Sequence, residues 1–231
     1  MKIGKLTLGK VPSLSGVIVS NLTPAVVSKA VRDGSDFIEL RVDTFKDRSP
    51  AHILGAIEKS KNTPPIILTI RSKKEGGEVK ISDSERLELF KELLPAASAI
   101  DIELSSKKIL KDVVSLATEQ KKAVIISFHD FKKTPKEEEL KKTIKEARSA
   151  GAGIVKIATL VKNAKDLKVL TSLLLENDDL IVIGLGEGGG STRVFFPMLG
   201  SLITYGSVTA HSAPGQMSIS NVKRDLKHFG Y

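Results

Sequence analysis

Residues 123–159 read "AVIISFHDFKKTPKEEELKKTIKEARSAGAGIVKIAT", and this stretch decides the fold. Two short runs rich in β-branched residues, 123–128 and 153–159, flank a longer charged segment with helical periodicity. That segment has acidic residues in its first turn and basic residues in its last, and Gly151 stands just past its end. The stretch therefore predicts a strand, a helix and a second strand parallel to the first.

The same alternation runs along the whole chain. Eight short apolar runs recur with helical stretches between them, at residues 16–20, 36–42, 65–71, 99–104, 123–128, 153–159, 180–185 and 202–207. Alternating strands and helices with short connections imply parallel strands joined by right-handed crossovers. Eight strands in 231 residues predict an α/β fold of the (β/α)8, or TIM, barrel type. An open doubly wound sheet is the alternative, but "GVIVSNLTP" lacks the G-x-G-x-x-G that often follows its first strand.

The start of the chain adds a small element to this pattern. Its residues "KIGKLTLGK" predict a short hairpin, which we expect to cap the bottom of the barrel. No linker or low-complexity segment interrupts the alternation, so residues 1–231 are expected to form one barrel domain. The N-terminus lacks the apolar core of a signal peptide, and no run approaches 18 apolar residues. These features favour a cytoplasmic protein that does not enter a membrane.

The composition narrows the classes of partner. With no cysteine, the chain can form neither a disulfide nor a thiolate metal site. The formal net charge is +9, which would suit a nucleic acid, an anionic membrane surface or a small anionic substrate. The lysines are dispersed among glutamates in helical segments, only 4% of residues are aromatic, and there is no tryptophan to stack on bases. We therefore expect a small anionic substrate and no nucleic-acid partner.

Charged residues interrupt several of the expected strands. The strands of a parallel barrel are normally near-continuous Val, Ile and Leu, and the functional site lies at their C-terminal ends. In this chain those positions carry Glu39, Arg41, Asp43, Arg71, Asp101, Glu103, His129, Asp130 and Lys156. Any one of the carboxylates could belong to a buried ion pair, but such pairs stabilise a fold only weakly. Together with His129 and Lys156 they predict a catalytic site.

Lys156 is the most informative of these residues. It lies within the apolar run "GIVKIAT", and burial disfavours a charged amine and lowers its pKa. An amine in that state is the nucleophile that forms imines with carbonyl substrates. The alternatives are a side chain that reaches the barrel mouth or one that pairs with Glu103.

His129 supports the imine interpretation. It ends the preceding strand, so it is expected beside Lys156, where its near-neutral pKa suits the proton transfers that imine chemistry needs. His52 and His228 fall in expected helices, and His211 could lie at the rim of the site. No two histidines have metal-ligand spacing along a helix, so no metal site is expected. The run "GEGGG" (186–190) could hold a phosphate through backbone amides, or form a lid or turn.

Seven motifs, taken together, resemble the type I 3-dehydroquinate dehydratase family, the Schiff-base class of that enzyme. They cover nearly the whole chain in order: "ELRVD" (39–43), "TIRSKKEGGE" (69–78), "DIEL" (101–104), "SFHDF" (127–131), "VKIAT" (155–159), "STR" (191–193) and "SAPGQ" (212–216). The resemblance implies a barrel, usually dimeric, that converts 3-dehydroquinate to 3-dehydroshikimate and water by syn elimination. This is the third step of the shikimate pathway of aromatic amino acid biosynthesis, and it uses no metal or organic cofactor.

The resemblance also implies roles for individual residues. Lys156 would form the imine, His129 would act as base and then acid, and Glu75 would orient His129. The residues that would bind substrate are Glu39, Arg41, Arg71, Arg193, Ser212 and Gln216.

The chain departs from the family pattern at three positions. Ile183 and Leu185 stand where methionines are common, and Tyr205 stands where phenylalanine is common.

Two other functions stay open. One alternative is an aldolase of the lysine class, for which "GEGGG" would bind a phosphate. The other is a basic binding module, which would bind nucleic acid in a salt-sensitive way.

Overall fold

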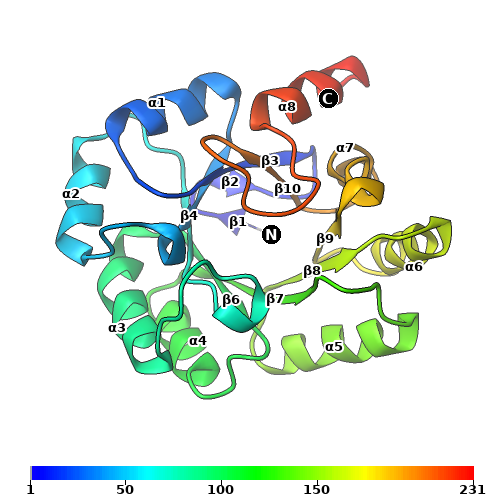
Figure 1. Cartoon of the computed structure of the whole chain (residues 1–231), viewed down its shortest axis with the longest axis horizontal. Coiled ribbons are helices and arrows are strands. Elements are labelled where there is room, and N and C mark those ends of the chain that lie inside the picture. The colour runs from blue at the N-terminus through cyan, green and yellow to red at the C-terminus, as the bar shows by residue number, and fades with distance from the viewer. Residues whose placement is uncertain (1) are drawn as a thin grey trace.

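The computed structural model describes residues 2–231, and its centre is an eight-stranded parallel sheet rolled into a nearly closed barrel (Figure 1). The strands follow one another around the barrel in chain order from β3 to β10, each paired with the next as far as β9, and β10 pairs with β3. Their bounds are β3 Ser13–Ile18, β4 Phe37–Arg41, β5 Ile66–Thr69, β6 Ala99–Glu103, β7 Ala123–Asp130, β8 Ile154–Leu160, β9 Leu180–Leu185 and β10 Ile203–Ser207. The barrel expected from the sequence is confirmed.

Within residues 2–231, eight α-helices surround the strands (Figure 1). They are α1 Pro24–Asp33, α2 Pro50–Lys59, α3 Asp83–Leu93, α4 Leu110–Glu119, α5 Glu137–Ser149, α6 Ala164–Leu175, α7 Thr192–Met198 and α8 Ile219–His228. Their ends follow local rules. The Thr23 hydroxyl accepts a hydrogen bond from the Val26 amide at the start of α1, and Gly151 adopts a φ of 98° just beyond α5. His52 and His228 lie in α2 and α8, as expected.

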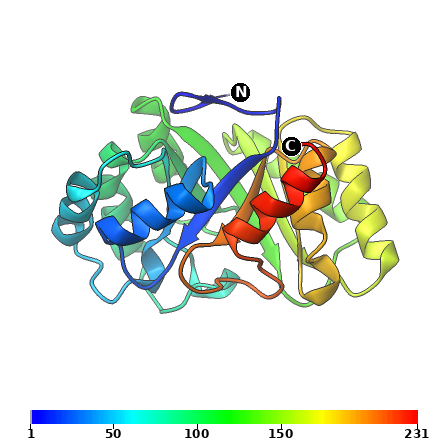
Figure 2. The same ribbon diagram turned by 90° about the horizontal axis from the view of Figure 1, so that it is seen from above.

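The barrel closes loosely at one seam and is covered at one end. Between β9 and β10 the Leu202 amide donates to the Leu180 carbonyl at 2.9 Å, and the described residues form no strand ladder there. Strands β1 (Lys2–Ile3) and β2 (Leu6–Thr7) form the antiparallel hairpin expected at the N-terminus. Figure 2 shows this hairpin across the end of the barrel opposite the loop that joins β10 to α8.

Two apolar layers hold the barrel together. The larger fills the space between strands and helices, and the smaller lies inside the barrel. The hairpin contributes Ile3 and Leu8 to the inner layer, so it seals the N-terminal end with apolar side chains. The opposite end, where the strands terminate, is therefore left for polar groups. Among the described helices, none has the length and apolar character needed to cross a membrane.

Candidate active site

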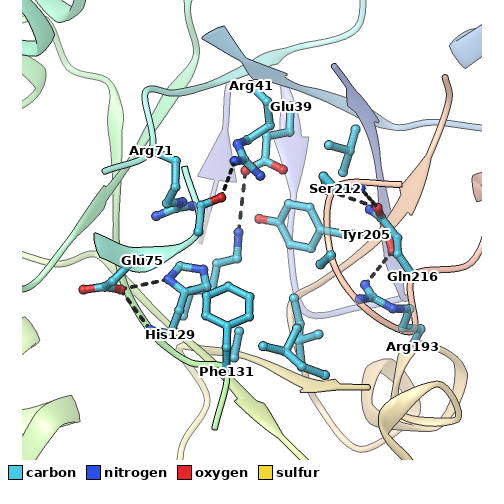
Figure 3. A pocket seen from close by; sticks show the side chains of 17 residues that line it. Glu39, Arg41, Arg71, Glu75, His129, Phe131, Arg193, Tyr205, Ser212 and Gln216 are labelled. Carbon is cyan, nitrogen blue, oxygen red and sulfur yellow. Dashed lines mark hydrogen bonds and ion pairs between the residues drawn. The ribbon is translucent and has the colours of Figure 1, made fainter. Parts of the chain in front are cut away.

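A pocket at the C-terminal end of the barrel brings the expected site residues together (Figure 3). The strands and their following loops supply its walls, as the fold dictates. The nine residues to which the family resemblance gives roles all line it: Glu39, Arg41, Arg71, Glu75, His129, Lys156, Arg193, Ser212 and Gln216. The other carboxylates expected at the strand ends are not among its lining residues: Asp43, Asp101, Glu103 and Asp130. Within residues 2–231, no group of three histidine, aspartate or glutamate side chains could hold a metal ion.

Lys156 projects from β8 into this pocket and is only 5% exposed. Its Nζ donates a hydrogen bond to Asp101 Oδ2 at 2.8 Å and lies 3.6 Å from Glu39 Oε1. Nζ also stands over the Tyr205 ring, 4.1 Å from its centre. The sequence suggested an amine isolated among apolar groups, with Glu103 as its alternative partner. The structure instead gives it Asp101 as a partner, so the two side chains form a buried ion pair.

Asp101 is the centre of a buried charge network. It is completely buried and lies 3.0 Å from Arg71, which also donates to Glu103 at 2.9 Å. Burial by itself would raise the pKa of Asp101, but Arg71 and Lys156 hold it below its ordinary value. Arg86 reaches in from α3 and donates to the other oxygen of Glu103 at 2.6 Å. The carboxylates of Asp101 and Glu103 therefore compensate the charge of Arg71.

His129 stands beside Lys156 on the neighbouring strand. Strands β7 and β8 pair in parallel with Ser127 opposite Lys156, so His129 follows two residues further toward the mouth. Its Nδ1 lies 3.0 Å from Oε2 of Glu75, which also accepts the His129 backbone amide at 3.0 Å. Burial, reinforced by Arg71 and Lys156, lowers the pKa of His129 well below its ordinary value. His129 is therefore a neutral imidazole at neutral pH.

Glu75 lies in a loop that is anchored to the end of β4. It belongs to a 3-10 turn, Lys73–Glu75, and its Oε1 accepts a hydrogen bond from the Ser105 hydroxyl. Arg41 donates to Asp43 at 2.8 and 2.9 Å and to the Gly76 carbonyl at 3.1 Å. Asp43 in turn accepts the backbone amide of Glu78 at 3.1 Å. Arg41 and Asp43 thus tie β4 to the loop that carries the partner of His129.

Arg193 lies on the opposite side of the pocket and has no compensating carboxylate. Among residues 2–231, no acidic side chain lies within 4 Å of it, and its guanidinium donates to the carbonyls of Tyr205 at 2.9 Å and Gly215 at 3.2 Å. Burial lowers the pKa of Arg193 to about 10, so it remains charged at neutral pH. A buried cation of this kind fits an anionic ligand group.

The loop between β10 and α8 closes over this side. The Gln216 side-chain oxygen accepts the Ser212 amide at 2.6 Å and its hydroxyl at 3.1 Å. The Gly186 amide donates to the Pro214 carbonyl at 3.1 Å, which joins this loop to the glycine-rich run. Within that run, a side chain at Gly189 would meet the backbone of Gly184 at 2.3 Å, so the glycine permits close packing against β9.

Sequence reasoning did not single out every contributor. Tyr205 was noted only as a departure, and Ser105 was not considered. Arg86 was missed because a helix arginine normally faces solvent. Its spacing from Leu89, Phe90 and Leu93 was the available signal, because these residues share the buried face of α3.

A (β/α)8 barrel that encloses a lysine, a histidine and an uncompensated arginine at its C-terminal mouth is the architecture of an enzyme for small anions. Comparison with known proteins identifies which kind. The model of the type I 3-dehydroquinase family matches residues 20–230, and the chain belongs to that family of lyases. The 3-dehydroquinate dehydratase of Methanococcoides burtonii is 33% identical over an alignment of 231 positions, and the alignment covers 98% of each chain.

Solved structures agree with this assignment. The 3-dehydroquinate dehydratase from Aquifex aeolicus is 33% identical with a TM-score of 0.84, covering 94% of this chain and 99% of that one. A type I 3-dehydroquinate dehydratase from Clostridium difficile with covalently modified comenic acid is 28% identical with a TM-score of 0.88. The match covers 99% of this chain and 96% of that structure.

Proposed function

We propose that this chain removes water from 3-dehydroquinate to give 3-dehydroshikimate, through an imine on Lys156, as the third step of the shikimate pathway. The observation that carries the proposal is the presence of Lys156 and His129 on neighbouring strands in one pocket. Family membership supports the choice of substrate. The covalent modification named for the Clostridium difficile relative is consistent with covalent chemistry in this family.

The first stage is formation of the imine. Lys156 Nζ, after giving up a proton, attacks the ketone carbon of the substrate, and the carbonyl oxygen leaves as water. Neutral His129, on the neighbouring strand, is placed to take that first proton and to return it to the departing oxygen. The protonated imine withdraws electrons from the neighbouring carbon and makes its hydrogen acidic.

The second stage is the elimination. Neutral His129 removes the acidic proton at C2 and becomes an imidazolium, which Glu75 stabilises from 3.0 Å. The C1–O bond then breaks, and the hydroxyl takes the same proton from His129 and departs as water. Water finally hydrolyses the conjugated imine, which releases the enone product and regenerates the Lys156 amine.

Substrate binding is divided between two sides of the pocket. Arg193, which has no carboxylate partner among residues 2–231, is proposed to bind the substrate carboxylate, with Ser212 and Gln216 closing over it. Glu39 and Arg41, on β4, are proposed to hold ring hydroxyls. Arg71 lines the pocket but is paired with Asp101 and Glu103, so we assign it chiefly to keeping those carboxylates ionised.

The test is an absorbance assay for the conjugated enone, followed by borohydride trapping of the enzyme with dehydroquinate. We expect turnover, and a covalent adduct on the peptide that contains Lys156. Lys156→Met should abolish both, whereas Lys145→Met, at an exposed position of α5, should change neither. Full activity in Lys156→Met would disprove the imine mechanism.

His129→Ala separates the two stages. Because the lysine remains, some imine should still be trapped, while turnover falls by about 100-fold or more. Normal turnover in this variant would remove His129 as the base. An aldolase would instead form a borohydride adduct with an aldol substrate and give no enone from dehydroquinate.

We also propose that the chain forms a homodimer. The support is an exposed apolar patch on the neighbouring helices α7 and α8 and the chain end, made by Phe195, Leu199, Phe229 and Tyr231. Phe195 and Phe229 are in contact, with ring centres 5.4 Å apart. Light scattering should give a dimer for the native chain and a monomer for Phe195→Glu. A monomeric native chain would overturn this proposal.

The cytoplasmic location is also a prediction, which cell fractionation would test.

A further inference from the structure

Three buried side-chain oxygens lack a hydrogen-bond partner among residues 2–231: the hydroxyls of Ser15, Ser35 and Tyr205. Only Tyr205 lines the pocket that holds Lys156. A buried hydroxyl without a partner costs free energy, and a phenylalanine of the same shape would avoid that cost. The tyrosine hydroxyl at this position therefore needs an explanation that the folded protein alone does not supply.

The hydroxyl of Tyr205 is directed at the reacting centre. Tyr205 belongs to β10, is 3% exposed, and holds Lys156 Nζ over its ring at 4.1 Å from the centre. Figure 3 shows its hydroxyl end turned toward the middle of the pocket, away from Gln216 and Arg193. A substrate carbon bonded to Lys156 Nζ would consequently lie next to this ring. The substrate carbons on either side of it would then lie close to the Tyr205 hydroxyl.

The Tyr205 hydroxyl can act only as a neutral donor. Burial, helped by the nearby charges of Glu39 and Asp101, raises the pKa of Tyr205 well above its ordinary value. Glu39, whose charge acts on Tyr205, already accepts the Thr69 hydroxyl at 2.8 Å through Oε1, and this oxygen lies 3.6 Å from Lys156 Nζ. A ligand hydroxyl placed between them could accept from Tyr205 and donate to Glu39, whereas a ketone or ether oxygen could only accept.

We propose that the Tyr205 hydroxyl donates a hydrogen bond to the ring hydroxyl on the substrate carbon next to the one that bonds Lys156. This assignment rests on the proposed function, because it places dehydroquinate on Lys156. Tyr205 is then a specificity residue: it rewards substrates with a hydroxyl beside the ketone, and its orphan donor disfavours those without one.

A substrate–variant cycle tests the contact. With dehydroquinate, Tyr205→Phe should lower kcat/KM by about three- to tenfold, chiefly through KM, because the lost hydrogen bond is present in both the ground and transition states. With the analogue that lacks the hydroxyl next to the ketone, the same substitution should cause no loss. Thr118→Val, which removes a hydroxyl at an exposed position of α4, is the control and should change neither. An equal loss with both substrates, or a loss confined to the rate of imine trapping, would overturn the proposal.

Stability gives an independent readout. Because no group of residues 2–231 pairs with this hydroxyl, Tyr205→Phe should unfold at the same or a higher temperature than the native chain. A merely structural tyrosine would behave in the opposite way. A clear fall in melting temperature would show that the hydroxyl has a partner inside the protein, and would overturn the proposal.

Spectroscopy separates this contact from the reaction itself. The chain has two tyrosines and no tryptophan, so in Tyr231→Phe the near-ultraviolet tyrosine band belongs to Tyr205 alone. Adding dehydroquinate should shift that band, with the double variant Tyr205→Phe/Tyr231→Phe as the blank. A shift without turnover would uphold the contact and overturn the proposed reaction. Turnover without a shift would overturn the contact alone, and no binding at all would overturn both.

Discussion

One oxygen of Glu75 serves two groups of His129: its Oε2 lies 3.0 Å from the backbone nitrogen and 3.0 Å from Nδ1. When Glu75 is ionised, Nδ1–H donates to it, which leaves Nε2 of the imidazole free to accept a proton. Burial raises the pKa of Glu75 to about 7 and lowers that of His129. Glu75, and not His129, therefore takes up a proton in the neutral range, and the protonation of Glu75 decides whether His129 can act as a base.

This pair should set the acid limb of the pH profile. As the pH falls through about 7, Glu75 takes up a proton and donates a hydrogen bond to Nδ1, so the imidazole carries its own proton on Nε2 and has no basic lone pair there. We expect kcat/KM to decline below that pH. In Glu75→Gln the plateau should drop by about 10- to 100-fold and the limb should move to lower pH. An unchanged limb in this variant would assign the titration to another group.

Glu75 should also make stability depend on pH. Its pKa is about 7 in the folded chain and near the ordinary 4.5 when unfolded, so the folded state binds the proton more tightly. The resulting stabilisation is complete below pH 4.5 and is lost as the pH rises through 7. Glu75→Gln should therefore gain several degrees in melting temperature, relative to the native chain, at pH 8 compared with pH 5. Glu58→Gln, exposed on α2, should show no such difference.

The barrel could be predicted because its signal is local and repeated. In residues 123–159, the β-branched runs, the charge order of the helix and Gly151 each specify their element through nearest neighbours, and the structure confirms β7, α5 and β8. The first and last residues of individual strands were harder to predict from the sequence. The first strand was expected at 16–20 but runs from Ser13 to Ile18, because Ser13 and Ser15 pair with β10 despite their polar side chains.

The members of the site were predictable, but their pairings were not. Strand order alone placed His129 beside Lys156, because consecutive strands of a barrel are neighbours. The partner of Lys156 depends instead on how far side chains reach inside the barrel. Asp101 and Glu103 share a face, yet only Asp101 contacts Lys156, while Glu103 binds Arg71 and Arg86. The contact of Glu75 with His129 spans 54 residues and came only from the family resemblance.

Arg193 should determine affinity for the substrate carboxylate. Its buried charge lacks an acidic partner among the described residues, so Arg193→Gln should lower kcat/KM by on the order of 100-fold. Arg193→Lys, which keeps the charge but loses the planar fork, should fall in between. The control is Arg224→Gln on the exposed face of α8. If the carboxamide analogue of dehydroquinate suffered the same loss, Arg193 would not be the carboxylate receptor.

Gly215 should be essential for closing the loop over the pocket. Its φ is +72°, and a side chain there would meet the Gly186 carbonyl oxygen at 2.2 Å. Gly215→Ala should therefore force this loop away from the glycine-rich run, withdraw Ser212 and Gln216, and lower kcat/KM by about tenfold or more. Limited proteolysis should then cut within residues 209–217 faster than in the native chain.

Gly200 provides a control, because its φ is also positive but no atom lies close to where a side chain would stand. Its φ is +104°, and nothing lies within 4 Å of a side chain built there. Both substitutions place alanine at a positive φ, which should cost about 1 kcal/mol of stability in Gly200→Ala and more in Gly215→Ala, where the clash adds to it. Only Gly215→Ala should also lose activity and gain a proteolytic site. Equal activity in the two variants would mean that catalysis does not depend on the contact between the loop at Gly215 and Gly186.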